Sequence, residues 1–170
     1  MEVFETIRTR RSIRRFRPDP LSRAQIERLL EAARWAPSAG NLQPWIFVVV
    51  TSPEVRAELA AAAYDQEFVA EAPAVVGVAA ALAATAPYGG RGRELYCLQD
   101  TAAAVQNVLL AAHEMGLGTC WVGAFDEAAV ARALGLGAEE RPVALIPVGL
   151  PAQSGRSGRR ELSDVVRWIE

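Results

Sequence analysis

Apolar residues recur along this chain with two spacings, and the spacing changes from one segment to the next. A stripe of apolar residues three and four positions apart, opened by Ser22 as a capping residue, predicts a helix over residues 22–35. The same spacing predicts helices over residues 3–10, 52–63, 65–71, 94–115 and 127–134. Continuous apolar runs predict strands over residues 46–50, 75–80, 119–125 and 142–148. The first of these strands is expected to be buried on both faces.

The segments between these elements are rich in Pro and Gly. Residues 12–17 are expected to be extended and to end at Pro18. Residues 36–45 and 87–93 are expected to be loops, the second of them mobile because it holds three glycines. After a polar tail, the amphipathic segment 162–168 is expected to close the chain by packing against the protein.

The helix predicted over residues 94–115 is apolar nearly all the way round. Asp100 is its only charge between Leu98 and Ala112. A helix of this kind is buried on more than one side, and in so small a protein the second side is expected to face another subunit. We therefore expect a homodimer that is built partly on this helix.

The composition indicates a globular protein rather than a disordered one. The chain has 170 residues, enough for a single domain over residues 1–170 with its own core, and 51% of them are hydrophobic. The acidic pI of about 5.6 argues against a general nucleic-acid-binding protein. Its most apolar run is too short to span a membrane, and its two cysteines form no CxxC pair, so a reduced, cytoplasmic protein is expected.

Six arginines fall within the ten positions 8–17, with no acidic residue among them. Such a cluster of like charges is unfavourable unless an anion or solvent screens it. Because guanidinium groups match phosphate oxygens, our hypothesis is a phosphate-bearing ligand held by Arg10, Ser12 and Arg14. The alternatives are a solvated basic face or a patch for nucleic acid.

A second candidate lies in the loop of residues 36–45. Ser38, Asn41 and Gln43 carry polar groups that can contact a flat polar ring, and Trp45 leads directly into the next strand. Loops held between a helix and a core strand often carry binding residues. The alternative is a structured turn in which Trp45 belongs to the core.

Several kinds of chemistry are disfavoured by the sequence. His113 is the only histidine, and no Gly-x-Ser-x-Gly motif accompanies it. Clustered metal ligands, a Walker motif and a Rossmann glycine fingerprint are absent from the sequence. A chain with little acid–base machinery and many anion donors indicates that a bound cofactor carries the reaction.

Five segments, in order along the chain, resemble signatures of the FMN-dependent nitroreductase family. They are Arg10-Arg-Ser-Ile-Arg-Arg-Phe16, Ala36-Pro-Ser-Ala-Gly-Asn-Leu-Gln-Pro-Trp45, the helix segment 99–107, Gly116-Leu-Gly-Thr-Cys-Trp-Val-Gly-Ala-Phe125 and Arg159-Arg160. The resemblance implies an α+β fold with a central, mostly antiparallel sheet flanked by helices. It also implies a homodimer with an exchanged C-terminal segment and two FMN sites at the interface.

The resemblance assigns cofactor contacts to individual residues. Arg10 and Ser12 would hold the FMN phosphate and ribityl chain together with Arg159 and Arg160, and Arg14 would lie near the pyrimidine edge, where it stabilises negative charge on the ring. The ring would be contacted from the other subunit by that subunit's Pro37, Ser38, Asn41 and Gln43. The backbone of residues 122–124 would face flavin N5. The implied cofactor-binding residues are Arg10, Arg11, Ser12, Arg14, Pro37, Ser38, Asn41, Gln43, Gln66, Val122, Gly123, Ala124, Arg159 and Arg160; Arg156 adds a further basic residue to the tail.

The implied activity is ping-pong hydride transfer from NAD(P)H to FMN and on to a nitroaromatic, quinone or similar small-molecule acceptor. Because the chain is short for the family, an open pocket edged by Tyr64, Phe68 or Tyr88 is expected. A flavin-binding regulatory protein with little turnover and a specialised member such as a dehalogenase, an azoline oxidase or a flavin-destroying enzyme remain alternatives. An arginine-rich nucleic-acid module is a further alternative, which the acidic composition disfavours. The choice between NADH and NADPH stays open.

Overall fold

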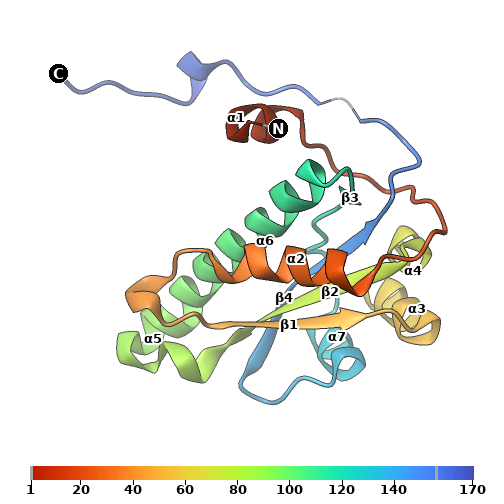
Figure 1. Ribbon diagram of the computed structural model, residues 1–170. Helices are drawn as coiled ribbons and strands as arrows, with labels where there is room; N and C mark the ends of the chain where they lie inside the picture. Colours follow the sequence, from red (N-terminus) through yellow and green to blue (C-terminus); the bar gives the residue numbers. More distant parts are fainter. Residues whose placement is uncertain (1, 156) are drawn as a thin grey trace.

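A four-stranded sheet with helices on both faces forms the body of the protein (Figure 1). The computed structural model describes residues 2–155 and 157–170. Every strand pairing is antiparallel, and the strands lie in the order β1-β2-β4-β3. Their bounds are β1 Trp45–Val50, β2 Ala74–Ala81, β3 Gly118–Thr119 and β4 Glu140–Gly149. The prediction of an antiparallel sheet flanked by helices is confirmed.

The two faces of the sheet carry separate hydrophobic cores. Val76 and Val78 of β2 pack toward α2 (Arg23–Arg34) and α6 (Cys97–Glu114). The alternate residue Val75 packs toward α3 (Pro53–Ala62), α4 (Phe68–Glu71) and α7 (Glu127–Leu134). This alternation is the period of two that a strand covered on both faces must show.

Local signals fix the ends of the predicted helices. At the start of α2 the Ser22 hydroxyl accepts a hydrogen bond from the Gln25 backbone N–H at 3.2 Å, and the Gln25 side chain accepts one from the Ser22 N–H at 2.9 Å. This reciprocal pair satisfies two donors that helix geometry leaves free. At the start of α7 the Asp126 carboxylate accepts a single hydrogen bond from the Ala129 N–H at 2.9 Å. The short first helix, α1, covers Val3–Thr9.

The strand predicted over residues 46–50 is confirmed as β1, but its expected burial is wrong, and the strand predicted over residues 119–125 is too long. The segment predicted to be buried on both faces forms β1, which pairs only with β2 at the sheet edge and leaves Val49 37% exposed. The strand predicted over residues 119–125 pairs as a strand only at Gly118–Thr119, with an isolated bridge at Val122. Opposite Cys120 lies Pro147, which accepts the Cys120 N–H at 3.4 Å but has no N–H to donate in return, so the ladder stops there.

The mobile loop predicted over residues 87–93 is also wrong. The chain there forms successive short helical segments, Leu82–Tyr88, Gly89–Arg91 and Gly92–Tyr96, which run directly into α6. A Cβ at Gly92 would lie 2.4 Å from the Thr85 carbonyl oxygen, so this glycine permits close packing rather than mobility. The rings of Tyr88 and Tyr96 pack edge to face with their centres 5.3 Å apart, and this contact stabilises the segment.

The C-terminal segment leaves the body of the protein and runs past α1 (Figure 1). It holds only a short 3₁₀ turn at Leu162–Asp164, and its Trp168 and Ile169 are 84% and 100% exposed. The expected packing of residues 162–168 is therefore not made in the described structure, where Leu162 and Val165 are exposed as well. None of the helices in the described parts of the chain is long and apolar enough to cross a membrane.

Candidate functional site

The arginine-rich stretch lies along the edge of the sheet beside β3. Ser12 forms a parallel bridge with Thr119, and the Ile13 N–H donates to the Thr119 carbonyl at 2.8 Å. Ile13 is buried against Gly118, where an added Cβ would lie 2.8 Å from its side chain. Because side chains alternate along extended backbone, Ser12 and Arg14 point to the side opposite Ile13, where both act on the Cys120 thiol. The predicted extended conformation is confirmed.

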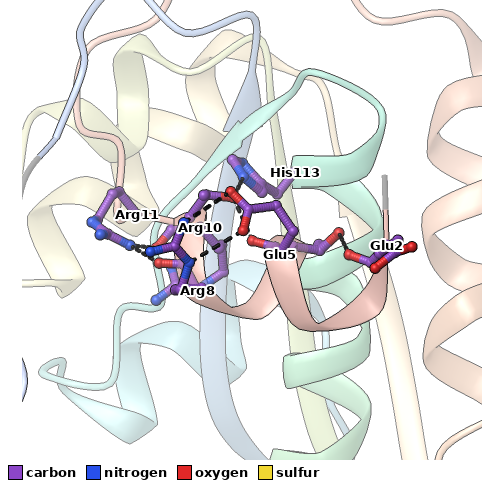
Figure 2. Close-up of polar contacts among 8 residues, drawn as sticks. Glu2, Glu5, Arg8, Arg10, Arg11 and His113 are labelled. Carbon is purple, nitrogen blue, oxygen red and sulfur yellow. Dashed lines mark hydrogen bonds and ion pairs between the residues drawn. The ribbon is translucent and has the colours of Figure 1, made fainter.

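Two of the arginines hold the local backbone in place (Figure 2). Arg8 pairs with Glu5 on α1 at 3.1 Å. The Arg11 guanidinium donates to the carbonyls of Arg8 and Arg10, both at 2.7 Å, and so satisfies acceptors at the end of α1. Its Nε is buried without a hydrogen-bond partner in the described structure.

Arg10 is a partly buried cation with other cations beside it. Burial, then the nearby charges of Arg159 and Arg11, lower the pKa of Arg10. No carboxylate within the described part of the chain forms an ion pair with it. A partly buried cation beside two others is stabilised when an anion enters. The donor set and the unpaired Arg11 Nε therefore fit a phosphate group.

Arg14 and Ser12 lie near a buried thiol and an aromatic ring. The Arg14 guanidinium carbon is 5.7 Å from the centre of the Phe68 ring. Burial raises the pKa of the Cys120 thiol, although Arg14, Ser12 and Arg10 act in the opposite direction. Arg10, Ser12 and Arg14 therefore surround the Cys120 thiol, which directly follows β3.

The Gln66 side chain reaches the segment of residues 122–124 from the connection between α3 and α4. The Gln66 side-chain amide donates to the Ala124 carbonyl at 3.2 Å and to the Ala63 carbonyl at 2.8 Å. Both backbone polar groups of Val122 are bonded to Leu145 at 2.9 Å. That the backbone of residues 122–124 faces flavin N5 stays a prediction, and the Val122 N–H is already bonded to Leu145 within the sheet.

The loop of residues 36–45 is a rigid structure of its own. The Ala39 N–H donates to both carboxylate oxygens of Asp100, at 3.1 and 3.2 Å. Gly40, Asn41 and Gln43 have positive φ, and the Ser38 hydroxyl accepts from the Gln43 N–H at 3.0 Å. Trp45 packs against the core. A structured turn is confirmed, and this turn presents the Asn41 and Gln43 side chains on its surface.

One protomer does not bring the two candidate regions together. The loop is bonded to Asp100 near the start of α6, whereas Thr9, next to Arg10, contacts His113 near its end. Thirteen residues of α-helix separate Asp100 from His113, which corresponds to about 20 Å. Pro37, Ser38, Asn41 and Gln43 therefore lie far from the arginines of the same chain.

The basic residues of the tail are only partly placed. Arg159 lies close enough to Arg10 to lower the pKa of Arg10, and the Arg159 guanidinium donates to the Gly158 carbonyl at 2.8 Å. Arg160 donates to the Asp164 carbonyl at 2.7 Å, which ties it to the tail itself. Arg156 lies outside the described residues.

A cavity of ≈ 390 Å³ opens behind the arginine stretch. His113 lies at the end of α6 next to this stretch (Figure 2). The sequence analysis gave His113 and Asp100 no part in a site. Both were usable signals, since His113 is the only histidine and Asp100 is the only charge between Leu98 and Ala112. The cavity is lined by Thr9, Arg10, Arg11, Ile13, His113, Gly116, Leu117, Gly118, Thr119, Pro151, Gln153, Ser154 and Gly155.

Comparison with known proteins places this architecture. A sequence model described as the nitroreductase family matches residues 7–76 and 61–150. A Thermus thermophilus protein named NADH dehydrogenase is 35% identical, with 94% of this chain and 92% of the relative covered. A Rhodobacter capsulatus 5,6-dimethylbenzimidazole synthase is 34% identical over 86% of this chain and 82% of its own length.

A solved structure extends the likeness to the fold. The nitroreductase-type protein of Desulfovibrio desulfuricans, crystallised in complex with FMN, is 35% identical and superposes with a TM-score of 0.90. The superposition covers 100% of this chain and 98% of that one. From its sequence and its fold alike, this chain belongs to the nitroreductase family.

Proposed function

We propose that this protein is an FMN-dependent NAD(P)H oxidoreductase of the nitroreductase type. The observation that carries the proposal is Arg10, a partly buried cation whose pKa is lowered by burial and by two neighbouring arginines. A family member 35% identical to this chain was crystallised with FMN. Bound FMN supplies hydride acceptance and donation, which no side chain of this protein supplies.

The residues divide the binding task by their chemistry. Arg10, Ser12 and Arg159 would hold the phosphate. Arg160 would join them once it leaves the Asp164 carbonyl to which it now donates. Arg14 would lie at the pyrimidine edge, where a fixed guanidinium favours the negatively charged reduced ring over the oxidised ring. Gln66 would contact the edge of the flavin ring, and the backbone amides of Gly123 and Ala124 would face its N5 atom. Arg11 contributes chiefly by holding the end of α1.

A second copy of the chain is needed to complete this site. The loop that carries Pro37, Ser38, Asn41 and Gln43 lies about 20 Å along α6 from the arginine stretch of its own chain. An exposed tail with bare apolar residues, among them Trp168 at 84% exposure, is available to cross to a partner. We therefore propose a homodimer with an exchanged tail and two sites, each built from both chains.

The same open face of the ring would serve donor and acceptor in turn, so ping-pong kinetics is expected. Nitroaromatics and quinones are the proposed acceptors, since flat electron-poor rings can stack where the nicotinamide has left. A second candidate, 5,6-dimethylbenzimidazole synthase, is favoured by the relative of that name. A flavin-binding protein with little turnover is the non-enzymatic alternative.

The absorption spectrum of the purified protein without oxygen tests the proposal. Flavin bands that bleach with NADH or NADPH and return with a quinone support it, and parallel double-reciprocal plots support the shared face. Bound flavin that neither nucleotide bleaches would favour the regulatory alternative. Formation of 5,6-dimethylbenzimidazole in air would favour the synthase. A protein that refuses added FMN overturns the proposal.

A further inference from the structure

The only histidine of the chain lies at the phosphate end of the proposed site. His113 belongs to the last turn of α6 and lines the ≈ 390 Å³ cavity together with Arg10 and Arg11. Figure 2 shows it beside the stretch that leads from α1 into the arginines. The proposed reaction leaves this titratable side chain without a task.

Hydrogen bonding fixes the orientation of its ring. The Thr9 hydroxyl lies 2.6 Å from the Glu5 carbonyl, which can only accept, so Thr9 donates there. The same hydroxyl oxygen is 2.9 Å from His113 Nε2 and therefore accepts from an Nε2–H. The neutral ring and the imidazolium both carry a proton on Nε2, so a second proton adds at Nδ1 without breaking the link to Thr9.

This link places α6 directly behind Arg10. Thr9 is the last residue of α1, and Arg10 is its C-cap. His113 therefore fixes the point at which the chain leaves the helix and begins the extended stretch. A change at the ring is transmitted to Arg10 through one hydrogen bond and one peptide unit.

The surroundings of His113 disfavour its charge until an anion arrives. Burial, then Arg10 and Arg11, lower the pKa of His113. An anion beside Arg10 acts in the opposite direction, since opposite charge favours the imidazolium. Within the described residues, the charged groups on the elements around it are Glu5 and Arg8 of α1, Arg10 and Arg11 of the stretch, Glu114 of α6 with its partner Arg28 of α2, and Arg159 of the tail.

We propose that His113 is a positioning residue of the cofactor phosphate subsite that takes up a proton from solvent at Nδ1 when the phosphate binds beside Arg10. The inference rests on the proposed function, because FMN supplies the anion. Proton uptake on binding makes binding tighter as the pH falls. His113 then has one pKa in the free protein and a higher one in the FMN complex. If the two differ by about one unit, FMN binds about tenfold more tightly at a pH below both values than at a pH above both.

The direct test is a proton NMR titration of the His113 ring, whose signals are unambiguous because no other histidine exists. The pKa is measured in the wild-type protein alone, with FMN and with riboflavin, while flavin fluorescence reports binding. FMN is expected to raise the pKa, and riboflavin, which has no phosphate, is expected to leave it unchanged. Bound FMN without a rise, or an equal rise with riboflavin, overturns the inference. Failure of FMN to bind overturns the proposed function itself.

A matched pair of variants separates charge from structure. His113→Gln keeps a donor for Thr9 but no longer titrates, and Glu114→Gln changes a charge on the same turn outside the cavity. FMN affinity is measured between about pH 5.5 and about pH 8, the range in which histidine titrates. The FMN phosphate also titrates near pH 6, so His113→Gln retains only that contribution. A gap of threefold or more between the pH profiles of His113→Gln and the wild-type protein, with Glu114→Gln following wild type, supports the inference. Superimposable profiles for His113→Gln and wild type contradict it.

Discussion

The bond between Asp100 and the loop of residues 36–45 offers the sharpest test of how the fold builds the second half of the site. Asp100→Ala removes both oxygens that accept the Ala39 N–H at 3.1 and 3.2 Å. Asp100→Asn removes the charge but keeps one oxygen in place. Because Asp100 is only 8% exposed, water cannot readily take over as acceptor.

The size of the effect follows from two opposing contributions. A hydrogen bond to a charged group contributes about 1.5–3 kcal/mol. The buried carboxylate is itself unfavourable, since burial raises the pKa of Asp100. We therefore expect Asp100→Ala to lower the free energy of unfolding by about 1 kcal/mol, which shifts the melting temperature of a domain of this size by about 2–4 °C.

The pH dependence has a definite sign. The pKa of Asp100 is raised in the folded state above its ordinary value of 3.8, so the folded protein holds this proton to higher pH than the unfolded chain does. The stability it contributes is fully present below 3.8 and is lost as the pH rises through the folded-state pKa. Asp100→Asn lacks this loss, and its stability relative to wild type is expected to improve as the pH rises across that window.

Urea denaturation of wild type, Asp100→Ala and Asp100→Asn at about pH 4 and about pH 7 measures both effects. FMN affinity should fall in Asp100→Ala and be largely kept in Asp100→Asn, because the loop is expected to contact the ring in the partner's site. An Asp100→Ala protein as stable as wild type at both pH values would refute the reasoning. So would a difference between wild type and Asp100→Asn that does not change with pH.

Three further changes test other parts of the structure. Arg10→Met is expected to weaken FMN binding about tenfold to about 100-fold without lowering the stability of the FMN-free protein, since like charges are relieved; Arg15→Met is the control, and fluorescence titration measures both. Gly118→Val is expected to displace Ile13, because a Cβ there would lie 2.8 Å from it, and to reduce thermal stability and FMN binding together; an unchanged melting curve would contradict this packing. Removal of residues 161–170 is expected to shift sedimentation toward a monomer with little change in the secondary structure seen by circular dichroism; a truncated chain that stays dimeric would rule out the exchanged tail.

Local sequence signals were sufficient where the determining interactions are close in the chain. The helix that follows Ser22 was predictable because the capping residue, its partner Gln25 and the apolar stripe all lie within a few turns. The strands β2 and β4 were predictable as two apolar runs of strand length, whereas their antiparallel pairing is visible only in the folded chain. The excess of charge in the arginine stretch is visible without any structure, and the anion site inferred from it stays a prediction.

Predictions failed where distant residues decide. The run at Trp45–Val50 was expected to be buried on both faces, but its exposure depends on its place at the sheet edge, where it pairs with β2. The glycines of residues 87–93 looked like a mobile loop, but Gly92 is required by the Thr85 carbonyl against which it packs. The strand after Thr119 ends early because Pro147 of another strand faces it.

The sequence by itself determined the secondary structure of most segments, the excess of arginine before Pro18 and the family signatures. Only the tertiary structure decided which of those arginines bond to the protein's own groups and which remain available to an anion. It committed Arg11 to the end of α1, tied the Val122 amide to Leu145, placed His113 behind Arg10, and set the loop of Asp100 about 20 Å along the helix from the cluster. The physical reason is that hydrogen-bonding groups are satisfied by whichever partners the folded chain brings to them, and neighbours in space cannot be read from spacing in the sequence.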